Sequence, residues 1–422
     1  MALLFDLNDL GIRCYSNGRL LHESPGVALT DGEQLLFGEQ ALRNSRSRPL
    51  HCFSRFWSQL DVHPIASGNP KVRHHADLAY LHLQHIQNRI EQPREAENAI
   101  LMLSGQTDRQ ALGLLLGIAR QCGLQVVGIV DTSLACLLPL VRTSRSMHVE
   151  MHLHHTIISQ LELFDGRLQL HNLEVLPKLG WLDLQQHLLR YLSNQFIRQT
   201  RFNPRHDAGN EQLLFDALPV YLQSAESQRV IECQLPGSTL QMNARDLCDE
   251  VESWLQPLSQ KLLLAARQET VFIGDHLSQL GMFLPTTLRA THLTKEQVGA
   301  ALTELGDKLE PGTDGLRFTR SLSCTLRTDE VTDEPATHIL HNSRAYPLAG
   351  TWSLLNRADA PLQAGAHPEA IALLRNNRIT LLNSDELQFN GQHLSGEHEL
   401  QRGDRLSLRQ HGTCLQMIKV EG

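Results

Sequence analysis

Histidine and glutamate side chains alternate in one short segment of this chain, and side chains of these types can bind metal ions. Residues 147–156 read MHVEMHLHHT, which places His148, Glu150, His152 and His154 at every second position. Alternate side chains of a β-strand point to the same face of its sheet, so on a strand these four would share a face. Imidazoles two residues apart on a strand can bind one metal ion.

The sequence identifies no further ligand for such a metal, and its 22 histidines are spread along the chain. We therefore expect no metal site, and we interpret the imidazoles as side chains that fill or line a cleft. A contact between domains that responds to pH is the alternative, because histidine changes its charge near neutral pH. The sequence has no nucleophile-elbow or P-loop pattern, so we expect no hydrolase chemistry of those kinds.

Length and composition restrict the class of protein. With 422 residues, 41% of them hydrophobic and 20% charged, the chain is long enough for two or three globular domains. A formal net charge of −8 argues against a general nucleic-acid binder. No apolar run reaches the roughly 18 residues of a membrane span, and the N-terminal MALLFDLNDLG lacks the basic region of a signal peptide. We therefore expect a cytoplasmic protein without nucleic-acid or membrane partners, whose eight cysteines are reduced.

The elements that must position the candidate side chains follow an α/β order. Residues 3–23 read as three strands joined by turns, and residues 77–90 as an amphipathic helix. Residues 99–138 then predict a strand, a helix capped by Gly123, a buried parallel strand and the start of another helix. Further along, Asp165-Gly166 predicts a tight hairpin turn between two strands.

The order of elements in residues 99–138 resembles the DnaK-type heat-shock chaperones of the actin-like ATPase superfamily. In that family a strand, a polar D-x-Q-R turn, a helix, a second strand and a helix opening with Thr-Ala-Ala follow one another. Residues 108–110 occupy the turn here, and residues 131–135 the start of the second helix. Leu179-Gly180-Trp181 is similar to the family's L-G-G-x-D segment. The resemblance implies an α/β, two-lobed ATPase-like body over residues 1–305, with lobe I at about 1–146 and lobe II at about 147–305.

The same resemblance implies that ATP and Mg²⁺ bind between the lobes, held by glycine-rich loops. Glycine is needed there because a Cβ would occupy the space of a phosphate. The family's first phosphate loop, D-x-G-T-T, corresponds to residues 6–11, where Asn8 stands at the expected glycine. Its second loop, D-x-G-G-G-T, corresponds to residues 150–156, which contain no glycine. The adenosine loop, G-G-x-[ST]-R, retains only Gly274 of its glycine pair.

These replacements predict a degenerate nucleotide site and a pseudo-ATPase, to which we assign no catalytic residue. The positions that would line the site are Asp6, Asn8, Glu150, His152, His154, Gly274 and Asp275. We expect a closed cleft filled by His152, His154 and their neighbours, with Asp6 accepting backbone hydrogen bonds at its turn. We expect no cofactor; ATP or ADP with Mg²⁺ is the alternative.

The C-terminal part differs in composition and predicts a separate all-β domain. Residues 306–335 include the turn-rich EPGTDG and the acidic TDEVTDEP, which indicate a linker or an edge segment. Short strands separated by turns follow over residues 336–422 and predict a small antiparallel sandwich. The stretch FNGQHLSGEHELQRGDRLSL resembles the second half of forkhead-associated domains, N-G-x-x-L…L-x-x-G-D-x-I, through Asn390-Gly391 and Gly403-Asp404.

Forkhead-associated domains bind phosphothreonine, and this resemblance implies Arg357 as the candidate contact. Asn356-Arg357 partly matches the G-R turn of those domains, whereas their S-x-x-H has no clear counterpart. We therefore expect a catalytically degenerate, chaperone-like scaffold or adaptor whose partners are other proteins, since the chaperones' peptide-binding module has no counterpart after residue 335. Two alternatives stay open: a nucleotide-binding, chaperone-like ATPase with altered phosphate loops, and a phosphothreonine-peptide adaptor acting through Arg357.

Overall fold

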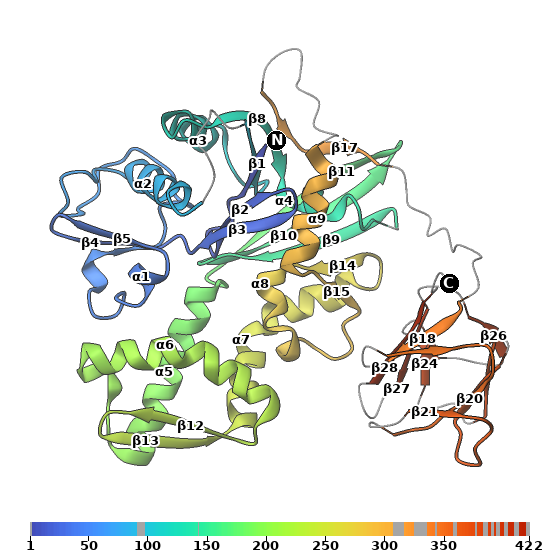
Figure 1. The fold of residues 1–422 in the computed structure, drawn as a ribbon. Helices are drawn as coiled ribbons and strands as arrows, with labels where there is room; N and C mark the ends of the chain where they lie inside the picture. The colour runs from blue at the N-terminus through green and yellow to red at the C-terminus, as the bar shows by residue number, and fades with distance from the viewer. Residues whose placement is uncertain are drawn as a thin grey trace. The chain divides into compact units, whose positions relative to one another are not determined.

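The computed structural model is a mixed α/β structure whose chain divides into two compact units, Met1–Leu326 and Arg327–Gly422 (Figure 1). Each unit is described by itself. The residues that the structure describes are 2–90, 98–141, 143–306, 316–324, 336–341, 344–357, 361–375, 378–382, 387–389, 392–393, 397–400, 404–408 and 413–418.

The first sheet of the N-terminal unit has the strand order β3-β2-β1-β7-β8-β16. The β1, β2 and β3 strands pair antiparallel, and β7, β8 and β16 continue the sheet in parallel from β1. The strands are β1 (Leu3–Asp6), β2 (Ile12–Ser16), β3 (Arg19–Ser24), β7 (Asn98–Leu103), β8 (Gln125–Asp131) and β16 (Phe318–Thr319). The three opening strands and the strand–helix–strand segment expected from the sequence are therefore present.

The second sheet, β17-β11-β10-β9-β14-β15, repeats the order of five of these strands, since β11-β10-β9-β14-β15 corresponds to β3-β2-β1-β7-β8. The sixth strand differs, because β17 joins β11 whereas β16 joins β8 at the opposite edge. In the second sheet, β9, β10 and β11 pair antiparallel, and β14 and β15 extend it in parallel from β9. The strands are β9 (Arg145–Met151), β10 (His155–Phe164), β11 (Arg167–Pro177), β14 (Thr270–Ile273), β15 (Ala290–His292) and β17 (Ser321–Ser323). The Asp165-Gly166 turn joins β10 to β11 with both residues at positive φ, as the sequence predicts.

Side chains of β1 divide between two cores, because alternate residues of a strand face opposite sides. Leu3 and Phe5 pack with helices α2 (His75–Gln87) and α3 (Arg109–Gln121). Leu4 instead enters a core that includes buried residues of both sheets and of helices α4 (Thr132–Leu137) and α9 (Lys295–Gly306). The two sheets are thus held together by a shared core.

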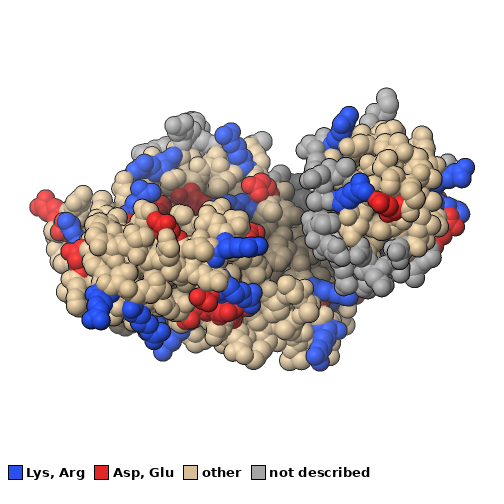
Figure 2. Space-filling model, turned by 90° about the horizontal axis from the view of Figure 1, so that it is seen from below, with Lys and Arg blue, Asp and Glu red and all other residues tan. Residues whose placement is uncertain are grey.

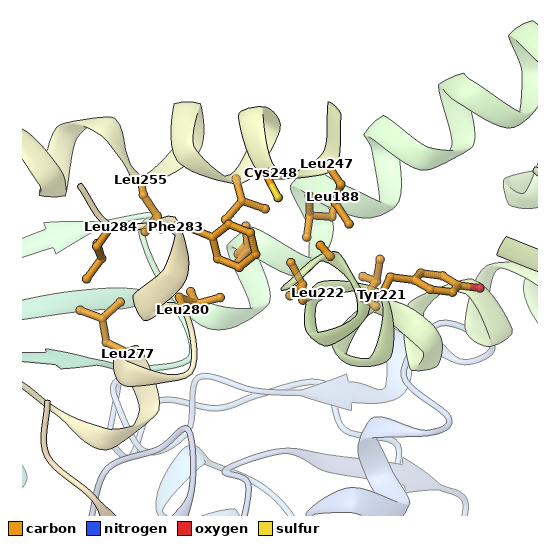
Figure 3. Packing of buried hydrophobic residues seen from close by; sticks show 14 of the residues in the cluster. Leu188, Tyr221, Leu222, Leu247, Cys248, Leu255, Leu277, Leu280, Phe283 and Leu284 are labelled. Atoms are coloured by element: carbon orange, nitrogen blue, oxygen red, sulfur yellow. The ribbon is translucent and has the colours of Figure 1, made fainter. Parts of the chain in front are cut away.

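A third core lies on the second sheet and is built largely from long helices. Leu188, Leu222 and Leu247 come from three different helices and point toward one another (Figure 3). These helices, and the small hairpin that packs one face against them, are α5 (Trp181–Thr200), α6 (Ala208–Ser227), α7 (Ala244–Ala265), β12 (Val230–Leu235) and β13 (Ser238–Asn243). The remaining elements of this unit are β4 (Ala28–Asp31), β5 (Gln34–Phe37), α1 (Glu39–Leu42), η1 (Pro49–His51), β6 (Cys52–Phe53), η2 (Pro204–His206), α8 (Asp275–Ser278) and η3 (Gly281–Phe283).

The segment expected as a linker or edge contributes a strand to each of the two six-stranded sheets of the N-terminal unit. The β16 strand pairs with β8, and β17 pairs with β11. The division between compact units falls at residues 326 and 327, inside that segment. Its residues 307–315 and 325–335 lie outside the described part of the chain.

The C-terminal unit consists of two antiparallel sheets, β19-β18-β28-β27-β24-β25 and β21-β20-β22-β23-β26. Buried Ile339 and Met417 of the first sheet and Leu354 and Leu374 of the second belong to one core, so the sheets pack against each other. The strands are β18 (His338–His341), β19 (Arg344–Pro347), β20 (Thr351–Leu354), β21 (Leu362–Ala364), β22 (Ala372–Arg375), β23 (Arg378–Leu381), β24 (Leu387–Phe389), β25 (Gln392–His393), β26 (Glu397–Glu399), β27 (Arg405–Leu408) and β28 (Thr413–Ile418). Of the turn residues singled out by sequence, Asn390, Gly391 and Gly403 lie outside the described residues.

The sequence predicts neither nucleic-acid nor membrane partners, and two structural features are relevant to that prediction: the surface charge and the hydropathy of the helices. On the face seen in Figure 2, the described lysine and arginine side chains are interspersed with aspartate and glutamate. Within the described ranges, the helices are all too short or too polar to span a bilayer.

Candidate functional site

The turn between β1 and β2 meets the turn between β9 and β10, and Asn8 joins them. Its side-chain Nδ2 donates to Glu150 Oε1 over 2.9 Å and to the Met151 carbonyl over 3.0 Å. Its Oδ1 accepts from the Leu10 backbone N–H over 2.9 Å. Both amide protons of this buried asparagine therefore bind the end of β9. Asn8 is the position at which the resemblance stated above implies a glycine.

Asp9 makes a second bridge between the same two turns. Its Oδ1 accepts from the Leu153 backbone N–H over 2.9 Å and lies 3.2 Å from His152 Nδ1. Burial alone would raise the pKa of Asp9, but the hydrogen bonds and the charge of His152 outweigh it and leave the pKa below its usual value. Asp9 is therefore ionised at neutral pH, inside the protein.

His152 lies between two carboxylates. Its Nδ1 faces Asp9, and its Nε2 is 3.7 Å from Glu150 Oε2. Burial opposes the charged ring, yet the two carboxylates raise the pKa of His152 to about 10. The ring also stacks on His155, with centroids 4.6 Å apart and planes inclined by 9°.

At neutral pH Glu150 is ionised, whereas the nearby Asp6 is partly protonated. Burial and the nearby Glu150 carboxylate raise the pKa of Asp6 to about 7. Glu150 is held ionised by His152 and Asn8, which lower its pKa against the effect of burial. Asp6 accepts a long hydrogen bond of 3.4 Å from the Asn8 backbone N–H, the role that the sequence analysis expected of it.

A fully buried arginine of the first sheet forms a second polar connection, to α8, the helix that follows β14 of the second sheet. Arg13 of β2 donates through Nε to Glu23 over 2.9 Å and through Nη2 to Asp275 over 2.6 Å. Lys295 binds the other oxygen of Glu23 over 2.6 Å. Sequence analysis did not single out Arg13; the available signal was an arginine in a strand whose neighbours are apolar.

At two glycines near this network, other protein atoms already occupy the space that a Cβ would need. A Cβ on Gly11 would lie 2.6 Å from Glu23 Oε1 and 3.0 Å from His276 Cε1. Gly274 donates its N–H to the Val149 carbonyl over 2.8 Å, and a Cβ there would lie 3.0 Å from that oxygen. The candidate positions Gly274 and Asp275 thus contact β9 and Arg13.

The expectation that four alternating side chains share one face is wrong beyond Met151, because β9 ends there. His148 and Glu150 lie on the strand, whereas the chain turns before His152 and His154. His152 then faces Asp9, while His154 Nε2 lies 2.8 Å from Ser54 Oγ and does not fill the contact between the turns. Among the described residues, no group of three histidine, cysteine, aspartate or glutamate side chains is arranged to hold a metal ion.

Two cavities border these contacts. The smaller, lined in part by Asp9, His152 and His155, measures about 60 Å³, room for a few water molecules. The larger measures about 730 Å³ and is lined in part by Glu23, His276 and Lys295. Its charged lining residues are Lys295, Arg43, Glu23, Glu39 and Asp216. This excess of carboxylates disfavours a polyanion, although the volume would admit a small molecule.

In the C-terminal unit, the candidate phosphothreonine contact is already paired. Arg357 Nη2 donates to the carboxylate of Glu369, and both side chains are exposed. Exposed ion pairs of this kind are weak, so a phosphate could compete for the guanidinium. Phosphopeptide binding by Arg357 stays a prediction.

Comparison with known proteins adds no family to this description. The sequence matches no protein-family model, and no curated protein matches it.

Proposed function

We propose that this chain is a divergent relative of the DnaK-type actin-like ATPases that has lost nucleotide handling and acts as a scaffold or adaptor for protein partners. The repeated strand order of the two sheets supports the two-lobed fold, with the second repeat beginning at Arg145, close to the expected lobe boundary. The opposed turns after β1 and β9 stand where that fold would hold phosphates.

The observation that carries the proposal is the pair of side-chain bridges between these turns. Asn8 and Asp9 bind Glu150, His152 and the opposite backbone over 2.9–3.2 Å. A phosphate chain between the turns would have to break these bonds and approach three buried carboxyl groups, Asp6, Asp9 and Glu150. Separating buried charges from their partners is costly, so the closed arrangement opposes nucleotide binding.

A scaffold also needs surface that a partner can cover. Leu213 and Val220 lie seven residues apart on α6, so they share a helix face, and they are 50% and 59% exposed. Exposed apolar side chains on one helix face are surface that a protein partner could cover. We propose this face of α6 as one contact for a protein partner.

Calorimetric titration of the full chain with Mg-ATP and Mg-ADP tests the loss of nucleotide handling, with thermal shift as a second readout. We expect neither heat nor stabilisation at millimolar nucleotide. Binding with a Kd of about 10 µM, which corresponds to about −7 kcal/mol, would overturn the proposal. It would favour the alternative of an ATPase with altered loops.

The Asn8→Gly variant is the matched comparison for this titration. It restores the glycine that a phosphate loop requires and removes the bridge to Glu150. Nucleotide binding that appears only in Asn8→Gly would show that the side-chain bridge excludes the ligand. We expect that neither wild type nor Asn8→Gly binds nucleotide, because the buried carboxyl groups of Asp6, Asp9 and Glu150 remain in both proteins.

A further inference from the structure

We infer that protonated His152 is a built-in cation that holds the β1–β2 and β9–β10 turns together by pairing simultaneously with Asp9 and Glu150. The inference concerns how the proposed closed site stays closed, and in that respect it rests on the proposed function. The two ring nitrogens face different carboxylates, Nδ1 at 3.2 Å from Asp9 Oδ1 and Nε2 at 3.7 Å from Glu150 Oε2. Asp9 and His152 are 143 positions apart, so the contact connects the two halves of the unit.

Burial makes a cation necessary at this position. The side chains of Asp9, Glu150 and His152 are 3%, 11% and 6% exposed. An ionised carboxylate removed from water is stable only when it is paired, and here two of them flank one ring. Asn8 supplies a neutral donor to Glu150, but Asp9 has only His152 and a backbone N–H on Oδ1, and its Oδ2 finds no hydrogen-bond partner among the described residues.

The groups around the His152 ring are consistent with one positive charge, on His152, and with neutral neighbouring imidazoles. His155 stacks on His152, and burial together with the charge of His152 lowers the pKa of His155 to about 4. Burial likewise lowers the pKa of His148, the other imidazole that His152 influences. The groups described around His152 thus include two carboxylates that attract its proton and two neutral imidazoles.

If His152 supplies the cation, its removal creates an anionic space that an external cation can occupy. The test measures thermal unfolding of the full chain as wild type, His152→Ala and His154→Ala, each with and without millimolar MgCl₂ or MnCl₂. We expect His152→Ala to unfold at lower temperature, and to recover part of the loss saturably with metal. Wild type and His154→Ala should not respond, because His154 contacts Ser54 instead of the two carboxylates. We expect metal to bind His152→Ala at least tenfold more tightly than wild type.

A measurement on the unaltered protein covers the case in which His152→Ala does not fold. Histidine-selective labelling and NMR titration of the wild-type chain should find His152 still protonated at pH 8. A neutral His152 ring at pH 7 would overturn the inference, as would a folded His152→Ala variant without a metal response. Nucleotide binding by wild type together with a metal response in His152→Ala would instead refute the proposed function and leave the inference standing.

Discussion

The side-chain amide of Asn8 donates to the carboxylate of Glu150 over 2.9 Å, although the two residues are 142 positions apart in the sequence. One residue follows the first strand of the first sheet, and the other lies near the end of the first strand of the repeated sheet. Equivalent ends of the two repeats are therefore tied directly by a side-chain hydrogen bond.

Replacing Asn8 with alanine should destabilise the N-terminal unit. The substitution leaves Glu150 Oε1 and the Met151 carbonyl without the donor that they share. Unpairing buried acceptors costs about 1–3 kcal/mol, more where one of them is charged. Urea unfolding of the full chain, followed by circular dichroism, would measure the change.

The control for Asn8→Ala is Asn172→Ala. Asn172 also donates a side-chain hydrogen bond, to Gln160 over 2.9 Å, but it is exposed. Removing it should change the stability by no more than about 0.5 kcal/mol. Equal effects of the two variants would contradict the bridging role of Asn8.

Replacing Asp6 with asparagine should stabilise the protein, increasingly so at higher pH. The folded-state pKa of Asp6, about 7, lies above the ordinary 3.8, so the folded chain holds this proton more tightly than the unfolded chain does. Stability is therefore lost as pH rises from about 4 through about 7, and asparagine removes that loss. The gain should be small at pH 4, larger at pH 5 and greatest above pH 7.

Paired unfolding curves of wild type and Asp6→Asn from pH 4 to pH 9 would test this, since other titrating groups largely cancel in the difference. A stability difference that does not change with pH would show that the pKa of Asp6 is the same in the folded and unfolded chains. An Asp6→Asn variant less stable than wild type at pH 8 would show that the charge of Asp6 is used by the fold.

The sequence predicts correctly those secondary-structure elements that depend on patterns within a few neighbouring residues. The strand–helix–strand segment and the Asp165-Gly166 turn follow from hydrophobic period and turn chemistry, which act over a few residues. The loop positions Asp6, Asn8 and Glu150 were found through a family resemblance, and they do lie together.

What the sequence could not predict depends on contacts between distant segments. His152 and His154 were assigned to one face because nothing local marks the end of β9 at Met151. Arg13 was missed because its partners Asp275 and Glu23 come from other elements, and a strand arginine by itself is uninformative. Tertiary pairing decides both cases.

Replacing Arg13 with alanine should be among the most damaging single changes in this unit. It leaves Asp275 without its ion-pair partner, and Glu23 retains only Lys295. Breaking a buried pair by removing one partner costs about 3–5 kcal/mol, and the partial exposure of Glu23 places the expected loss near the lower end. Chemical unfolding would measure it.

Arg48→Ala is the matched control for Arg13→Ala. Arg48 also pairs with an aspartate, Asp31, but both side chains are 45% exposed. Such a surface pair is worth about 0–1 kcal/mol. If Arg48→Ala were as damaging as Arg13→Ala, burial would not be the reason for the effect of Arg13.

The stabilising effect of His152 should disappear in alkaline solution. Its folded-state pKa of about 10 lies above the ordinary 6.5, so its contribution is fully present below about pH 6.5 and is lost as pH rises through about 10. Comparing wild type with His152→Gln between pH 6 and pH 10 should therefore give a stability difference that shrinks with pH. A difference that grows with pH would mean that the neutral ring is the stabilising form.

Replacing Gly180 with alanine should disturb the β9–β10 turn, which holds His152. A Cβ there would lie 2.4 Å from His154 N and 2.5 Å from His155 N, so either the start of α5 or the β9–β10 turn must move. We expect Gly180→Ala to cost more than the roughly 1–3 kcal/mol typical of overpacking, because backbone atoms are struck. Gly113→Ala, in α3 with no atom within 4 Å of its Cβ among the described residues, should instead stabilise by about 0.5–1 kcal/mol. Thermal unfolding of both variants measures this, and a tolerated Gly180→Ala would show that α5 and the turn are not in the close contact on which the position of His152 depends.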